Sequence, residues 1–364
     1  MPEPFKNMFN LKVIRKLAAD VHSVYDPFQT DEFVESTVDE TWENLELKER
    51  VLKVTVNLRK YLPSDYREAI SVIDKVVMNY GSWLEGTGWF FPFFVELYGV
   101  DEENWDVSMG ALERYTQYAS AESAVRPFII MNEERMMAQM YAWSKHESEH
   151  VRRLSSEGCR PALPWTQALN SFKKDPTPIL PILEQLKADG SVWVRKSVAN
   201  NLNDISKTHP DLVVKIAKEW YGKNEHTDWI VKHACRTLLK KGNNEALAIF
   251  GLEDAAAVEV SGFALEAAST KIGEDITFSF TIFAKADTKA RLEYAIDYVK
   301  SSGKRNRKVF QISEISLKEN TKKPYTRKHS FEDVSTRKHY PGVHSITLIV
   351  NGAERGTLDF ELTV

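Results

Sequence analysis

The sequence DGSVWVRKSVANNLND, residues 189–204, decides the fold, because it recurs in related form on both sides. The earlier copy is HESEHVRRLSSEGCR, residues 146–160, and the later copy is HTDWIVKHACRTLLK, residues 226–240. A pattern that recurs at a regular interval is the signature of stacked supersecondary units. The sequence therefore predicts a repeat architecture in this part of the chain.

The interval between the copies identifies the kind of repeat. Val151, Val194 and Val231 occupy the same position in the three copies, so the intervals are 43 and 37 residues. Repeats of the HEAT and armadillo type have periods of roughly 40–47 residues and consist of helices. They stack into an α-solenoid with a long concave face. We therefore predict a HEAT-like α-solenoid whose function depends on what lines that face.

Each copy combines an apolar stripe with a polar one. In the middle copy, three- and four-residue steps place an apolar set on one face of a helix. That set is Val194, Val198, Leu202 and Ile205. The polar stripes are Lys196, Asn200 and Asp204 in the middle copy, His150, Arg153 and Glu157 in the first, and Lys232, Arg236 and Lys240 in the third. We interpret them as mostly cationic stripes that point the same way; the alternative is a solvated outer face.

The composition is that of an ordinary globular protein with more than one domain. The chain has 364 residues, 43% hydrophobic and 27% charged, and a net charge of −4. A nucleic-acid footprint would therefore have to be local. The two cysteines, Cys159 and Cys235, predict reduced thiols in a cytosol rather than a disulfide framework. No secretory signal and no apolar run of ~18 residues appears, so we expect a cytoplasmic protein without a membrane partner.

The residue pattern of the sequence changes after Gly251. The strings DITFSFTIFAKA, RLEYAIDYVK, RKVFQISEISL, HSITLIVNG and TLDFELTV alternate apolar and polar residues and are rich in β-branched and aromatic side chains. Five to seven short strands in about 110 residues fit an immunoglobulin-like β-sandwich without its disulfide. We predict a HEAT-like helical domain over residues 1–254 and an immunoglobulin-like domain over residues 255–364.

Three strings in the helical region are similar to those of a known family. They are ESAVRPF at residues 122–128, RRLSSEGCRPALPW at 152–165 and VRKSVANNLNDISKTHP at 194–210. They resemble the bacterial DNA alkylation-repair glycosylases of the AlkC/AlkD type, and more closely the AlkC branch, part of which carries a trailing immunoglobulin-like domain. The resemblance implies a HEAT-like enzyme of base excision repair. It would remove cationic N-alkylated bases, notably 3-methyladenine and 3-methylcytosine, from double-stranded DNA.

The chemistry of that reaction defines the residues it needs. A base alkylated at N3 carries a positive charge and departs neutral, so no general acid has to protonate it. The site has to stabilise an oxocarbenium-like sugar and guide water to it, a problem that glycosidases solve with carboxylates. An aromatic face adds cation–π attraction for the charged base, roughly 0.5–2 kcal/mol. Carboxylates and indoles among phosphate-binding cations are the expected constellation.

The resemblance places the catalytic carboxylates at Glu122, Glu157 and Asp204. Each also has a structural interpretation. Asp204 can be a helix-end residue that faces water, and Glu122 can open a helix. Glu157 can pair with Arg153 one turn earlier. Trp165 closes the string RPALPW, and we interpret it as a stacking or wall residue for the lesion, with an ordinary core tryptophan as the alternative.

Basic residues in both domains are the predicted DNA contacts. Such side chains position a duplex through its phosphates without reading sequence, and surface ion pairs are the alternative. The stretches KSSGKRNRK at residues 300–308 and KKPYTRKH at 322–329 are interpreted as basic loops that grip DNA or serve solubility. Trp193 and Trp229 are expected to pack in the repeat core. The predicted contacts are Arg152, Arg153, Arg160, Arg195, Lys196, Lys232, His233, Arg236, Lys304, Arg305 and Arg307.

Other interpretations stay open at this point. HESEH at residues 146–150 fits the H-E-x-x-H pattern of zinc proteases, but its polar surroundings argue against a buried metal helix, so no metal is expected. The sequence contains no phosphate-binding glycine loop, so we expect no nucleotide cofactor. The main prediction is a monomeric, monofunctional glycosylase without cofactor. The alternatives are a non-catalytic HEAT-repeat binder of DNA structure and a protein-interaction scaffold.

Overall fold

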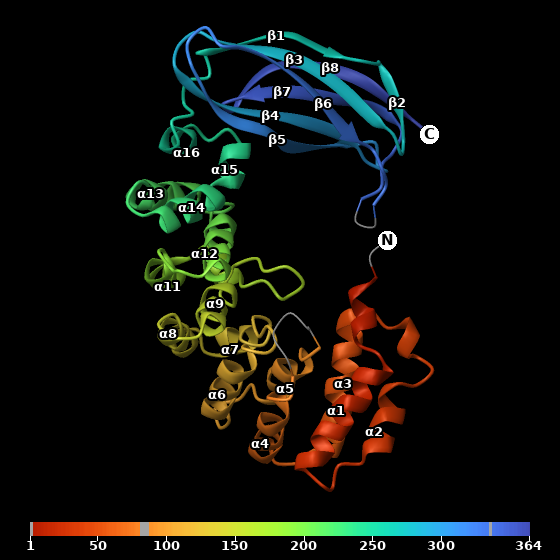
Figure 1. Cartoon of the computed structure of the whole chain (residues 1–364). Helices are drawn as coiled ribbons and strands as arrows, with labels where there is room; N and C mark the ends of the chain where they lie inside the picture. The colour runs from red at the N-terminus through yellow and green to blue at the C-terminus, as the bar shows by residue number, and fades with distance from the viewer. Residues whose placement is uncertain (1–2, 81–86, 335–336) are drawn as a thin grey trace. The chain divides into compact units, whose positions relative to one another are not determined.

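The computed structural model of the chain is helical in its first part and β-rich in its last part (Figure 1). It describes residues 3–80, 87–334 and 337–364. The order of the elements confirms the predicted succession of a helical region and a β-sandwich.

The helices and strands gather into two compact units. The first comprises Met1–Thr208 and Asn224–Ala234, and the second comprises His209–Lys223 and Cys235–Val364. The chain thus passes between the units more than once before the strands begin. The predicted domain boundary at residue 254 rests on composition alone and stays a prediction.

The first unit consists of α-helices and their connections. Short 3-10 helices also occur at Phe5–Met8, Trp42–Asn44 and Thr177–Ile179. Within the described part of the chain, no helix has the length and apolar character needed to cross a membrane. The α-helices are α1 (Leu11–Val24), α2 (Thr30–Thr37), α3 (Leu47–Tyr61), α4 (Tyr66–Val77), α5 (Phe90–Tyr98), α6 (Trp105–Tyr115), α7 (Arg126–Met131), α8 (Glu133–Trp143), α9 (Glu149–Glu157), α10 (Asn170–Lys174), α11 (Leu180–Leu186), α12 (Val192–Ile205) and α14 (Glu225–Ala234).

The three sequence repeats form three neighbouring helices. α12 packs against both α9 and α14, and α8 and α11 pack on the same stack (Figure 1). The aligned residues Val151, Val194 and Val231 are all buried. Ser191 caps the N-terminus of α12, because its hydroxyl accepts a hydrogen bond from the backbone N–H of Trp193 at 3.2 Å. The predicted repeats and the apolar stripe of the middle copy are confirmed.

The third repeat helix is shorter than predicted. α14 ends at Ala234, and a separate helix, α15 (Arg236–Lys240), follows. Between them Cys235 has a φ of −76° and a ψ of 0°, still in the right-handed helical region, and its carbonyl accepts a hydrogen bond from the backbone N–H of Leu239 at 2.9 Å. The third copy is therefore two short helices separated by one residue, and the polar stripe of Lys232, Arg236 and Lys240 stays a prediction.

The second unit contains α13 (Pro210–Trp220), α15, α16 (Asn244–Ile249) and a sandwich of two sheets. One sheet has the order β1-β3-β6, and the other has the order β2-β8-β7-β4-β5. Neighbouring strands are antiparallel except β2 and β8. The core includes Phe278 and Leu348. The strands are β1 (Val258–Leu265), β2 (Ser269–Lys271), β3 (Asp275–Ala284), β4 (Thr288–Val299), β5 (Arg305–Leu317), β6 (Lys322–Ser330), β7 (Gly342–Val350) and β8 (Ala353–Thr363).

Of the two basic stretches that were predicted to be loops, residues 322–329 form a strand and residues 300–308 do so from Arg305 onward. Residues 322–329 lie in β6, and Arg305 and Arg307 lie in β5. Both strands are at sheet edges, where charged side chains stay in water and the apolar alternation of a strand is weak. In β6 only Tyr325 and His329 are buried. The loop prediction is wrong for these residues, although Arg305 and Arg307 are exposed as expected.

A histidine is held between two tyrosines inside the sandwich. His329 Nδ1 lies 2.9 Å from the Tyr294 hydroxyl, and its Nε2 lies 2.6 Å from the Tyr298 hydroxyl. Burial, with the nearby charge of Arg337, lowers the pKa of His329 to about 4. Burial also lowers the pKa of His344. The folded sandwich therefore favours neutral imidazole rings.

We expect acid to destabilise the sandwich. Because the folded-state pKa of His329 lies below the usual 6.5, its stabilising contribution is complete above about pH 6.5 and is lost as the pH falls toward 4. The loss from His329 alone is about 2 kcal/mol at pH 5. Calorimetric unfolding of the whole chain at about pH 7.5 and pH 5 measures it. In His329→Phe, which cannot take up a proton, the two melting temperatures should lie closer together than in the wild type; an unchanged difference would contradict this account.

Candidate active site

The predicted carboxylates lie at the ends of adjacent elements. Glu157 is the last residue of α9, and Asp204 lies in the last turn of α12. Glu122 lies in the turn that precedes α7. Because α9 packs along α12, the ends of two repeats bring Glu157 and Asp204 together, with only 7% and 2% of their side-chain surfaces exposed.

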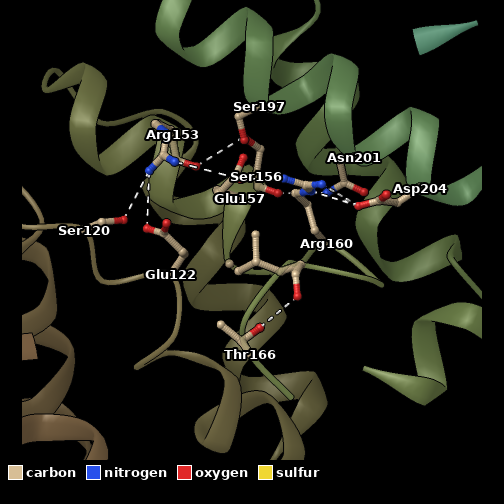
Figure 2. A network of polar contacts seen from close by, with 12 residues as sticks. Ser120, Glu122, Arg153, Ser156, Glu157, Arg160, Thr166, Ser197, Asn201 and Asp204 are labelled. Carbon is tan, nitrogen blue, oxygen red and sulfur yellow. Dashed lines mark hydrogen bonds and ion pairs between the residues drawn. The ribbon is translucent and has the colours of Figure 1, made fainter. Parts of the chain in front are cut away.

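Arg160 joins the two buried carboxylates (Figure 2). Its Nη1 donates to Glu157 Oε1 at 2.6 Å, and its Nε donates to Asp204 Oδ2 at 2.9 Å. Its Nη2 lies 2.8 Å from the same aspartate oxygen. The other Asp204 oxygen accepts from Lys207 Nζ at 2.8 Å. One guanidinium thus fixes the orientation of carboxylates from two repeats.

Arg153 links this pair to the third carboxylate. Its Nη1 lies 3.3 Å from Glu122 Oε2 and 3.4 Å from Ser120 Oγ. Its Nη2 lies 3.9 Å from Glu157 Oε1. The guanidinium carbon also lies 4.8 Å from the ring centroid of Trp193. The three carboxylates and the two arginines therefore form one row of alternating charge (Figure 2).

The row is buried except at its Glu122 end. Glu122 exposes 22% of its side chain, and Lys207, which pairs with Asp204 at the other end, exposes 48%. Burying a carboxylate without a partner costs several kcal/mol. The paired arginines offset this cost and allow the buried carboxylates to stay charged. The arrangement presents negative oxygens that are oriented before any substrate arrives.

The geometry separates the earlier alternatives for these carboxylates. Asp204 is buried, so the interpretation as a helix-end residue facing water is wrong. Glu157 does contact Arg153 one turn earlier, but its shorter ion pair is with Arg160. Within the described residues, no group of three or more His, Cys, Asp or Glu side chains is arranged to hold a metal ion.

Trp165 is exposed in the loop that follows α9. With 75% of its surface accessible, it is not the core tryptophan of the alternative interpretation. Its φ is +63°, an uncommon and strained conformation for a bulky residue. Its carbonyl accepts a hydrogen bond from Lys48 of α3. Trp165 and Glu122 line one pocket together with apolar side chains of α3 and α5, so the indole borders a hollow that reaches a predicted catalytic carboxylate.

Glu96 is a further carboxylate of this pocket that sequence reasoning missed. It lies on α5, and its Oε2 is buried with no hydrogen-bond partner among the described residues. Burial raises the pKa of Glu96, while hydrogen bonding to Ser123 and the charge of Lys48 partly offset the rise. An acidic residue inside the aromatic run FFPFFVELY was a usable signal, because carboxyl groups with shifted pKa values cluster at functional sites.

Many of the predicted DNA-contacting cations have partners within the protein. Besides Arg153 and Arg160, Arg152 Nε donates to Asp189 at 2.7 Å, and Arg195 Nη1 donates to the Asp189 carbonyl at 2.8 Å. In the second unit Arg307 pairs with Glu354, and Arg305 donates to Ser345 and to the Val343 carbonyl. Phosphate contact stays a prediction for every one of them. Those that are exposed or half-buried are Arg152, Arg153, Lys196, Lys232, His233, Arg236, Lys304, Arg305 and Arg307.

The repeat tryptophans differ from the expectation of core packing. Trp229 is 39% exposed and stacks on His233 with 5.2 Å between ring centroids. Trp193 is half-buried beneath Arg153. The prediction is wrong for Trp229, and Trp193 forms part of the wall of the charged row.

Known proteins share this architecture. The family model for DNA alkylation repair enzymes matches residues 100–238, and the model for the C-terminal Ig-like domain of the uncharacterised protein YhaZ matches residues 259–364. The chain is 48% identical over 357 residues to YhaZ of Bacillus subtilis (strain 168), covering 98% of this chain and 99% of that one. It is 37% identical to Pseudomonas fluorescens alkylpurine DNA glycosylase AlkC, solved bound to DNA containing an abasic site analog, with a TM-score of 0.94 and full coverage of both chains. The resemblance seen in the sequence is thus confirmed, and the chain belongs to the family of DNA alkylation repair enzymes, in the AlkC-type branch with a C-terminal immunoglobulin-like domain.

Proposed function

We propose that the protein is a DNA glycosylase that hydrolyses the N-glycosidic bond of cationic N3-alkylated bases, namely 3-methyladenine and 3-methylcytosine. The observation that carries the proposal is the pair of buried carboxylates, Glu157 and Asp204, held by Arg160 at the ends of two repeat helices. A buried pair of acids is costly to maintain for stability alone. It suits a reaction in which positive charge develops on a sugar.

The proposed reaction proceeds by departure of the base and capture of the sugar by water. When the bond between C1′ and the base breaks, the cationic base takes the electron pair and leaves neutral. The positive charge moves to the sugar, where a preorganised carboxylate stabilises it by several kcal/mol. Water then adds to C1′, and a carboxylate accepts its proton. We assign these roles jointly to Glu122, Glu157 and Asp204, and the proposal includes no lyase step.

Trp165 is proposed to recognise the charged base. Its exposed indole offers an aromatic face near Glu122. A cation over such a face gains about 0.5–2 kcal/mol, whereas a neutral base gains less. This difference favours alkylated bases over ordinary ones.

Double-stranded DNA is the proposed partner. The AlkC relative is described as bound to DNA in its solved structure, and this chain shares its fold over the full length. The surface and half-buried cations of the helices and of β5 provide candidate phosphate contacts, and such contacts position a duplex irrespective of sequence. We propose that the protein acts as a monomer and without a cofactor.

Base release from methylated DNA tests the function. We expect purified protein, in the presence of a metal chelator, to release 3-methyladenine that chromatography resolves from intact DNA. Parallel DNA containing 3-methylcytosine measures the preference between the two lesions. If the wild-type protein releases neither base, the proposed enzyme activity is wrong.

A salt titration separates the glycosylase from the scaffold alternative. Phosphate contacts release counterions, so we expect DNA affinity to fall steeply between about 50 mM and 200 mM salt. A scaffold for other proteins predicts no such binding. A non-catalytic DNA binder predicts the salt dependence without base release.

A further inference from the structure

Arg126 is a buried arginine that the proposed reaction does not use. It is the first residue of α7, four residues after Glu122, and only 1% of its surface is exposed. Among the described residues, no carboxylate lies within ion-pair distance of its guanidinium, and its Nη2 is buried with no hydrogen-bond partner. Burying a charged guanidinium without an ion-pair partner is costly, so the presence of Arg126 at this position needs a physical reason.

The guanidinium binds the backbone of the loop that follows α9. Its Nη1 donates to the carbonyls of Gly158 and Arg160, both at 2.9 Å. Its Nε donates to the carbonyl of Gln167 at 2.7 Å. The three carbonyls come from both ends of one loop, so a single side chain fixes how the loop leaves α9 and how it returns.

Two further contacts close the same loop. The backbone N–H of Leu169 donates to the carbonyl of Pro161 at 3.2 Å. At Gly158 a Cβ would lie 2.5 Å from Val125 Cγ2, so only glycine allows the end of α9 to approach the residue before Arg126 this closely. The loop is therefore packed directly on the start of α7.

This loop carries the two residues that set the geometry of the site. Arg160 bridges Glu157 and Asp204, and Trp165 stands exposed with a strained backbone. An arginine whose carbonyl is fixed has less freedom at its guanidinium. A strained φ persists only where neighbouring contacts determine the backbone.

We propose that Arg126 is a positioning residue that sets the backbone of residues 158–167, and through it the bridge made by Arg160 and the outward pose of Trp165. The role rests on the proposed function, because it is defined by base release. Arg126 does not contact the row of carboxylates by any ion pair. It acts through the backbone.

The guanidinium of Arg126 keeps its charge inside the protein. Burial lowers the pKa of Arg126 to about 10, which is still well above neutral pH.

Arg126→Lys, with Arg50→Lys as matched control, tests the proposal. Lysine keeps the charge but cannot reach three carbonyls from one planar group. Arg50 is equally buried, at 2% exposed, and donates to three carbonyls that are not in the loop, those of Leu45, Lys6 and Phe9, and to Glu43. Both variants lose bonds to three buried carbonyls, so a loss of stability alone should affect both of them.

We expect Arg126→Lys to lower the single-turnover rate of base release by about 10- to 100-fold while DNA affinity changes less than about twofold, since a small misplacement has effects of this size. Arg50→Lys should release base at the wild-type rate. Equal rates in the two variants overturn the proposal. So does a loss confined to DNA affinity with an unchanged rate at saturation.

Amide hydrogen exchange of the wild-type protein provides a measurement that needs neither activity nor a folded variant. We expect the hydrogen-bonded amides of Arg160 and Leu169 to be protected in the wild type and their protection to fall selectively in Arg126→Lys. Rapid exchange of both amides in the wild-type protein overturns the positioning role. Protection of the loop without any base release by the wild type leaves that role intact and locates the failure in the proposed function.

Discussion

Asp204→Asn should lower the single-turnover rate of base release by about a thousandfold or more and leave DNA binding within about twofold. The substitution keeps the shape of the side chain and one oxygen that can accept from Arg160. It removes the negative charge that we expect to face the developing sugar cation. Because that interaction strengthens only in the transition state, its loss should lower the rate of base release and not the affinity for DNA.

Asp189→Asn is the matched control for this result. Asp189 is also nearly buried, with 7% of its side chain exposed, and it also pairs with an arginine, Arg152. It lies outside the row of carboxylates. Rates are compared by chromatography of the released base, and affinities by anisotropy of labelled DNA. An equal loss of rate in both variants would show that Asp204 acts through stability alone.

Arg160→Met should destabilise the protein by about 3–5 kcal/mol and abolish base release, because it leaves two buried carboxylates without their shared partner. Arg160 Nη1 and Nε lie 2.6 Å and 2.9 Å from the oxygens of Glu157 and Asp204. Methionine retains much of the volume but none of the charge. Denaturant unfolding of the whole chain measures the loss of stability.

Two further variants identify the cause of that loss. Adding Glu157→Gln and Asp204→Asn to Arg160→Met removes all three charges and should recover a large part of the stability, but none of the activity. Arg114→Met breaks an ion pair with Asp74 whose side chains are 47% and 29% exposed, and it should cost about 1 kcal/mol. A triple variant as unstable as Arg160→Met alone would contradict the electrostatic explanation.

The sequence allowed the prediction of features that depend on local periodicity. Val151, Val194 and Val231 identified three helices that pack side by side, because burial of one face imposes the same spacing in each repeat. The end of α14 at Ala234 was missed, since no proline or glycine marks the one-residue break at Cys235.

Pairings between distant residues were outside the reach of pattern reasoning. Arg160 was predicted to contact phosphate, yet it is buried and binds Asp204, 44 residues away in the sequence. Such a contact depends on how α9 and α12 pack and not on local spacing. Arg126 stood inside a recognised string but received no role, because its partners are carbonyls, which a sequence does not display.

The strands of the sandwich also differ in how well the sequence pattern predicted them. Those with a buried apolar face, such as β3 and β4, were predicted from alternation. The edge strands β5 and β6 were partly interpreted as loops, because their charged residues stay exposed. Edge strands tolerate this composition, which protects them from pairing with other chains.

The central claim is that the buried carboxylates between α9 and α12 cleave the glycosidic bond. It is tested most directly by comparing base release from methylated DNA by the wild-type protein and by Glu157→Gln, at protein concentrations that saturate the DNA. The account predicts that the wild type releases 3-methyladenine in the presence of a chelator, whereas Glu157→Gln binds the same DNA with similar affinity and releases none. Release by Glu157→Gln at the wild-type rate would contradict it.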